Sequence, residues 1–142
     1  MRDINRIIVH CSATTVDVSA ETIRKWHKKK GWRDIGYHYV IRADGTIETG
    51  RPIKEAGAHT RGHNKDSIGI CLAGGYDGTT DDYTEEQWHS LEVLIGGLYK
   101  MCYGLEVRGH NDYTNSKTCP NFDVDYWWAT GRVQEHQPRR VG

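Results

Sequence analysis

Residues 6–11, with the sequence Arg-Ile-Ile-Val-His-Cys, are the stretch around which the rest of the chain can be placed. The run is apolar and rich in β-branched side chains, so it predicts a buried β-strand. His10 lies near its end, next to Cys11. Because neighbouring side chains of a strand point to opposite faces of a sheet, we expect Cys11 in the core and His10 on the other face.

A second stretch, residues 108–120, supplies side chains that would complement His10. It reads Arg-Gly-His-Asn-Asp-Tyr-Thr-Asn-Ser-Lys-Thr-Cys-Pro and predicts an irregular loop between a short apolar strand and a Trp-rich helix. A loop held at both ends can aim side chains at one point. His10, His110 and Cys119 would give a tetrahedral metal three ligands and leave a fourth position open, which distinguishes catalytic from structural zinc sites. Taken singly, His10 is more simply interpreted as a core histidine and Cys119 as a buried thiol.

Strand-like and helix-like segments alternate along the rest of the chain. In order, they are a helix, the two strands of a hairpin, a buried strand, a long helix, a short strand and a final helix, at residues 20–30, 37–42, 46–49, 67–73, 84–102, 105–108 and 123–129. Ser19 can cap the first helix, and Thr84 with Gln87 forms the capping-box pattern that begins the long one. Both helices are expected to have an apolar face, formed in the first by Ile23, Trp26 and His27 and in the second by Trp88, Leu91, Leu94, Ile95, Leu98 and Cys102.

The bulk composition limits the class of protein. The chain has 142 residues, the size of one compact domain. Its 19 basic and 19 acidic residues balance, which argues against strong nonspecific attraction to nucleic acid or to anionic membranes. No apolar run reaches the length of a transmembrane helix and the N-terminus has no signal-peptide core, so we expect a soluble protein made in the cytosol. Without a secretion signal, the four cysteines favour metal binding or burial over a disulfide framework.

The expected architecture is one α/β domain, residues 1–133, in which helices pack on a central β-sheet. Residues 134–142 are polar and are expected to form a frayed tail. Five tryptophans and eight tyrosines stand against one phenylalanine. Such rings combine an apolar face with a polar tip and suit grooves that bind polar polymers, although we expect most of them to fill the core. The oligomeric state that we expect is a monomer.

Several short motifs occur in one order along the chain. They are His10-Cys11-Ser12-Ala13-Thr14, Gly36-Tyr37-His38-Tyr39, Asp44-Gly45-Thr46, Gly57-Ala58-His59, Asn64, Ser67-Ile68-Gly69-Ile70, Gly109-His110 and Lys117-Thr118-Cys119-Pro120. In this arrangement, from about Ile7 to Trp128, the chain resembles the zinc-dependent N-acetylmuramoyl-L-alanine amidases, the family that includes the lysozymes of T-odd coliphages and the peptidoglycan recognition proteins. One such motif alone is weak evidence for the family, whereas all of them in the same order are strong evidence for it.

The resemblance implies a mixed β-sheet flanked by helices, with one Zn²⁺ per chain in a groove that accepts peptidoglycan. It implies that His10, His110 and Cys119 bind the metal. It also implies that Tyr37 and Lys117 lie beside the metal as catalytic residues. A phenol or an ammonium there would stabilise the oxyanion formed in amide hydrolysis, and the leaving amine needs a proton. How Tyr37 and Lys117 divide these two tasks stays open.

Two further positions carry expectations from the family. His59 resembles a groove histidine, and from an exposed loop it would contact the substrate. Some related bacterial amidases place a glutamate base on the strand that corresponds to residues 68–72. Here that position falls on Cys71. We therefore expect the branch of the family that works with a tyrosine and a lysine.

The function that we expect is hydrolysis of the amide between N-acetylmuramic acid and L-alanine in bacterial peptidoglycan. A chain without a signal peptide suits a phage or prophage endolysin, which stays in the cytoplasm of the producing cell and acts on the wall after release; delivery by a secretion machine is the other route. The alternative is a non-catalytic peptidoglycan-binding module, but such members of the family lack the cysteine ligand and Cys119 is present. A third class is a regulator of another protein, such as a polymerase, which the short chain ahead of His10 does not favour.

Overall fold

The computed structural model describes residues 2–135. The strands in this range are β1 (Arg6–Cys11), β2 (Tyr39–Ile41), β3 (Ile47–Thr49), β4 (Ser67–Leu72) and β5 (Glu106–Gly109). The helices are α1 (Ala20–Lys29), α2 (Glu85–Met101) and α3 (Val124–Thr130), with a 3₁₀ turn, η1 (His110–Asp112), directly after β5. The predicted alternation of strands and helices is confirmed, although β2 is shorter than the predicted segment 37–42.

The five strands form one mixed sheet in the order β3-β2-β4-β1-β5. β1 runs parallel to both of its neighbours, β4 and β5, and β2 runs parallel to β4. The predicted hairpin, between β2 and β3, is the one antiparallel pair among the five strands of this sheet. A parallel strand with neighbours on both edges is covered on both faces, which explains the continuous apolar run of β1.

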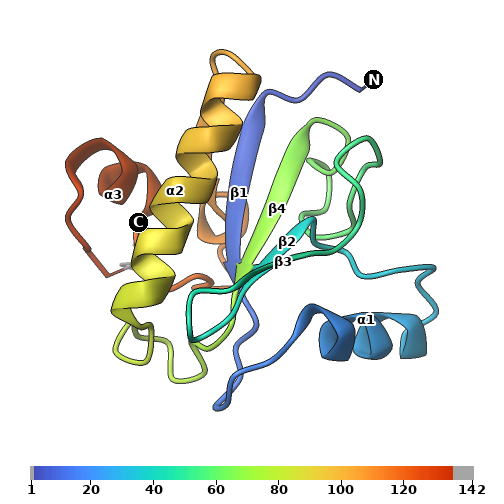
Figure 1. The fold of residues 1–142 in the computed structure, drawn as a ribbon, viewed down its shortest axis with the longest axis horizontal. Helices are drawn as coiled ribbons and strands as arrows, with labels where there is room; N and C mark the ends of the chain where they lie inside the picture. Colours follow the sequence, from blue (N-terminus) through green and yellow to red (C-terminus); the bar gives the residue numbers. More distant parts are fainter. Residues whose placement is uncertain (1, 136–142) are drawn as a thin grey trace.

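Helices cover both faces of this sheet (Figure 1). α2 and α3 pack on one face, where Ile7, Val9 and Cys11 of β1 join the larger core. α1 packs on the other face through Ala20 and Ile23. The alternation of β1 therefore places Cys11 under α2 and α3, as predicted, and turns His10 toward the side of α1.

The helix starts follow the predicted capping. The Ser19 side chain accepts a hydrogen bond from the backbone of Thr22, and Thr84 with Gln87 forms a complete capping box. Within α2, the buried side chains include Leu91, Ile95 and Leu98, all predicted for its apolar face.

One side chain of the predicted apolar face of α1 is placed differently. Ile23 and His27 are buried, but Trp26 is 44% exposed. The Nδ1 atom of His27 accepts a hydrogen bond from the backbone of Gly36, so His27 takes the inward position together with Ile23. The expectation that Trp26 is a core ring is wrong, because Trp26 lies on the helix side that borders an open cleft.

The chain remains attached to the fold beyond the boundary expected at residue 133. The backbone N–H of Asp123 donates to the carbonyl of Gln134, and Phe122 forms a bridge with Glu135. Gln134 and Glu135, the first residues of the predicted tail, thus contact the segment that precedes α3; the rest of that tail, 136–142, lies outside the described residues. Among residues 2–135, no helix is long and apolar enough to cross a membrane.

Candidate metal centre and cleft

The fold brings together the three residues that the sequence nominates as metal ligands. His10 stands near the end of β1, and His110 follows directly after β5, its parallel neighbour. The carboxyl ends of neighbouring parallel strands lie at the same edge of a sheet, so the two imidazoles meet there. Cys119 completes the set, and the ligand atoms of all three residues lie within 4.8 Å of one another.

A buried asparagine holds the two ends of the loop from His110 to Cys119 together. The backbone N–H of Asn111 donates to the carbonyl of Cys119 over 2.9 Å. Its side-chain amide donates to the carbonyls of Thr118 and Phe122, each over 3.0 Å. Asn111 was not among the predicted site residues, although an asparagine directly after a candidate ligand is a signal for side-chain hydrogen bonds to the nearby backbone.

The surroundings of the ligands fit a metal. The Nε2 atom of His10 lies 2.9 Å from Nδ1 of His59 and 3.2 Å from Oγ1 of Thr60, which leaves Nδ1 of His10 as the nitrogen available to a cation. The sulfur of Cys119 accepts a hydrogen bond from the backbone N–H of Cys11 over 3.0 Å. A backbone donor favours the charged thiolate, which is the form that binds a metal.

The protonation states also fit. Burial, followed by the charges of His59, His110 and Lys117, lowers the pKa of His10 well below its ordinary value. Burial and then Lys117 lower the pKa of His110. Both imidazoles are therefore neutral at pH 7, as metal ligands must be. The neighbouring Cys11 thiol and burial raise the pKa of Cys119 in the protein alone, but a coordinating cation deprotonates a thiol outright.

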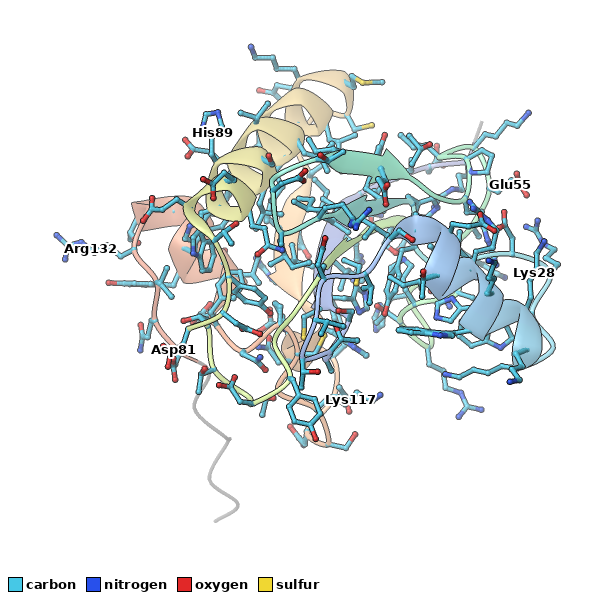
Figure 2. All side chains as sticks on the ribbon, turned by 60° about the horizontal axis from the view of Figure 1, so that its bottom comes forward. Lys28, Glu55, Asp81, His89, Lys117 and Arg132 are labelled. Atoms are coloured by element: carbon cyan, nitrogen blue, oxygen red, sulfur yellow. The ribbon has the colours of Figure 1, made fainter. Side chains whose placement is uncertain are left out.

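A cleft of about 860 Å³ opens above this cluster and is lined by His110 and Cys119. Tyr37 and Lys117, the two residues expected to be catalytic, also line it. The ring of Tyr37 lies 5.1 Å from that of His10, centroid to centroid. Lys117 is exposed on the loop that ends in Cys119, at the lower edge of the molecule in Figure 2. The structure thus brings all five residues to one place.

The cleft continues past α1 into a second hollow of about 560 Å³. The two share Ala13, Trp26 and Tyr76. Trp26 is 44% and Tyr76 66% exposed, so both rings offer faces to whatever occupies the junction. Apart from these and two valines, Val16 and Val18, the second hollow is lined by hydroxyl-bearing and charged residues, namely Thr14, Thr15, Asp17, Ser19, Thr22 and Arg42.

His59 is placed differently from the exposed substrate-contacting residue that we expected. It borders the cleft, but it is partly buried and its ring is turned into the protein. Its Nδ1 lies 2.9 Å from Nε2 of His10, and its Nε2 lies 3.2 Å from Oγ of Ser67. The sequence could not show this orientation, because it depends on β4 lying beside the loop that carries His59.

Cys71 is the position for which we expected no carboxylate base. It pairs with His10 across β4 and β1 and is fully buried against Tyr37. Burial raises the pKa of the Cys71 thiol well above its ordinary value, so this side chain is neutral.

The fold and the site together define a class: a single-domain α/β protein with a His-His-Cys cluster that could hold a metal ion, beside a surface cleft. Comparison with known proteins gives the family. The family described as N-acetylmuramoyl-L-alanine amidase matches residues 1–122. The chain belongs to this family.

Bacteriophage proteins are among its relatives. The chain is 42% identical over 137 residues to the endolysin of Klebsiella phage KP32, covering 93% of this chain and 90% of that protein. It is 44% identical over 132 residues to the endolysin of Escherichia phage T7, covering 89% of this chain and 87% of the relative.

Solved structures show the same fold. The N-acetylmuramoyl-L-alanine amidase LysC from Clostridium intestinale URNW superimposes with a TM-score of 0.76 at 30% identity, over 88% of this chain and 81% of LysC. A point mutant of the Drosophila protein PGRP-LB, in complex with tracheal cytotoxin, gives a TM-score of 0.78 at 25% identity, over 96% of this chain and 86% of that one. The expected mixed-sheet fold of the amidases and recognition proteins is confirmed.

Proposed function

We propose that this protein is a zinc-dependent endolysin that hydrolyses the amide between N-acetylmuramic acid and L-alanine in bacterial peptidoglycan. One observation carries the proposal: two neutral imidazoles and a thiol converge within 4.8 Å at a cleft that Tyr37 and Lys117 also line. The amidase family and the phage endolysins at more than 40% identity support the same reaction.

His10, His110 and Cys119 would hold one Zn²⁺ per chain. Zinc with three protein ligands lowers the pKa of a coordinated water to about 7 and polarises a carbonyl, which is the chemistry that amide hydrolysis requires. The protein orients these ligands through the Asn111 clamp and the backbone N–H of Cys11. Such contacts behind the ligands set their direction and their affinity for the metal.

Tyr37 and Lys117 would act on the substrate amide. Burial first and then the nearby thiol of Cys71 raise the pKa of Tyr37 well above its ordinary value, so its hydroxyl stays protonated and can donate a hydrogen bond. Lys117 brings a positive charge to the rim of the same cleft, where it lowers the pKa of both His10 and His110. Donors aimed at a developing oxyanion are worth about 10²- to 10³-fold in rate. The ammonium of Lys117 can also supply the proton that the leaving amine needs.

The shape of the cleft fits a branched polymer. The scissile amide joins a sugar to a peptide, so a substrate extends in two directions from the metal. The two joined hollows, of about 860 and 560 Å³, offer room on both sides of Trp26 and Tyr76. Exposed aromatic faces bordered by hydroxyl and charged groups suit sugars and peptides alike.

The proposed setting follows from the relatives. Phage endolysins are related over nearly the whole chain. We propose that the protein is made in the cytoplasm of the producing cell, works as a monomer without nucleic acid, and reaches the wall after release. The balance of 19 basic and 19 acidic residues supports the absence of a nucleic-acid partner.

The direct test is digestion of purified peptidoglycan with zinc-loaded protein, followed by mass spectrometry and labelling of new amino termini. We expect new L-alanine amino termini and, on N-acetylmuramic acid, lactyl groups with a free carboxyl. Cys119→Ser should lose both zinc and activity, while Cys102→Ser, which changes the same residue type at the end of α2, should lose neither. Cleavage of a different bond, or binding to the wall with no cleavage by the zinc-loaded protein, would refute the proposal; the second result would identify a recognition module.

A further inference from the structure

The His59 ring is held inside the protein through both of its nitrogens. Nδ1 lies 2.9 Å from Nε2 of His10 and 2.9 Å from the hydroxyl of Thr60. Nε2 lies 3.2 Å from the hydroxyl of Ser67 at the start of β4. A histidine that served the substrate would keep a nitrogen free for it, and His59 keeps none.

Two glycines leave room for this ring. A Cβ atom on Gly69 would stand 2.6 Å from Cδ2 of His59, and one on Gly57 would stand 2.7 Å from the same atom. Both distances are too short for any side chain. Because Gly69 lies between Ser67 and Cys71 on β4, the three residues share the face of the sheet on which His10 lies. The backbone thus fixes the plane of His59 next to His10.

The hydrogen bonds of His59 depend on which nitrogen carries its proton. With the proton on Nε2, His59 donates to Ser67 and accepts from Nε2–H of His10, so Nδ1 of His10 keeps its lone pair. With the proton on Nδ1, His59 would donate to Nε2 of His10, and a neutral His10 would then carry its proton on Nδ1. Only the first arrangement lets His10 bind a metal through the nitrogen that points away from His59.

We propose that His59 is a positioning residue of the metal centre: it accepts the Nε2–H of His10, and so fixes the His10 ring and keeps its Nδ1 free to bind zinc. Hydrogen-bond partners behind metal-ligating histidines commonly act in this way. The inference rests on the proposed zinc site, and it replaces the role in substrate contact that the sequence suggested for His59.

The test measures zinc affinity by competition with a chromophoric chelator, without any substrate. His59→Leu should weaken zinc binding about 10- to 100-fold, the usual loss when such a partner is removed. His59→Asn should stay within a few-fold of the wild type, because its amide oxygen can take the place of Nδ1. His89→Leu is the matched control, since His89 is exposed on α2, far from Lys117 in Figure 2, and should leave zinc affinity unchanged.

A second variant and a second measurement separate positioning from loss of structure. Ser67→Ala removes the acceptor for Nε2–H of His59 and should weaken zinc binding several-fold, without a change in the buried apolar core under α2. Urea unfolding of the metal-free proteins shows whether each variant folds. The absorption of the cobalt-substituted protein reports the geometry of the His-His-Cys centre, and in His59→Leu its bands should shift or weaken.

The proposal would be overturned if His59→Leu and Ser67→Ala both bound zinc within twofold of the wild-type affinity. A raised KM for peptidoglycan in the same His59→Leu protein would then assign His59 to the substrate. The outcome is independent of the reaction: wild-type protein that binds zinc but forms no L-alanine termini would refute the proposed function and leave the role of His59 standing. Wild-type protein that binds no zinc would overturn both.

Discussion

Asn111 offers the sharpest test of how the loop from His110 to Cys119 is held. Replacing it with alanine removes two side-chain hydrogen bonds, to the carbonyls of Thr118 and Phe122. The carbonyl of Thr118 keeps a bond from the backbone of Asn121, so the larger loss falls on that of Phe122, which is buried. At about 1 kcal/mol for a lost bond and 1–3 kcal/mol for an acceptor left unpaired, we expect a loss of about 2–3 kcal/mol.

Urea unfolding of the metal-free protein measures this loss directly, and the melting temperature should fall by about 8–12 °C, at about 4 °C per kcal/mol for a chain of this size. Zinc affinity should fall as well, because the clamp joins the two ligand-bearing ends of the loop. Asn115→Ala is the matched control: Asn115 is exposed on the same loop and should change stability by less than about 0.5 kcal/mol. A loss below about 0.5 kcal/mol for Asn111→Ala would show that its amide is not a clamp.

Three further predictions concern the cleft and the core. Tyr37→Phe should lower kcat about 10²-fold or more with unchanged zinc affinity, as steady-state assays and chelator competition would show; a change in KM alone would contradict a donor role. Trp26→Ala should raise the KM for intact peptidoglycan about 2- to 12-fold and barely affect a short muropeptide, and an equal effect on both would argue against the extended cleft. Burial lowers the pKa of His38 to about 4, so the unfolded chain binds more protons below pH 6.5 and stability should fall by up to about 3 kcal/mol between pH 6.5 and 4. Urea titrations across this range should show a shallower decline in His38→Gln.

The prediction for His38 has a structural cause. Its Nδ1 accepts the backbone N–H of Gly69 over 3.0 Å, and its Nε2 lies 2.8 Å from the carbonyl of Glu55. The neutral ring satisfies both partners at once. Protonation of Nδ1 would place its N–H against the N–H of Gly69, in a site where His38 is only 1% exposed. The folded state therefore disfavours the charged form of His38.

Much of the fold could be predicted from local pattern. Three local patterns were sufficient for this: the β-branched run of β1, the Ser19 cap and the Thr84–Gln87 capping box. Each depends on residues close together in the chain, so it can be recognised in the sequence. The alternation of strands and helices was enough to indicate an α/β sheet with helices packed on it. The hydrogen bond from Asp123 to Gln134 could not be predicted in this way, because Gln134 lies in a polar stretch whose composition does not indicate a partner.

The candidate site was likewise predictable in part. By itself, the sequence determined the set of chemical groups, since His10, Tyr37, His110, Lys117 and Cys119 stand in motifs that match one family in order. Only the tertiary structure decided what lies around them. His59 was expected to face the substrate, yet the glycines of β4 and of its own loop admit its ring behind His10; Trp26 was expected in the core, yet it borders the cleft. The physical reason is that the direction of a side chain depends on which strand or loop packs against it, and those neighbours come from distant parts of the chain.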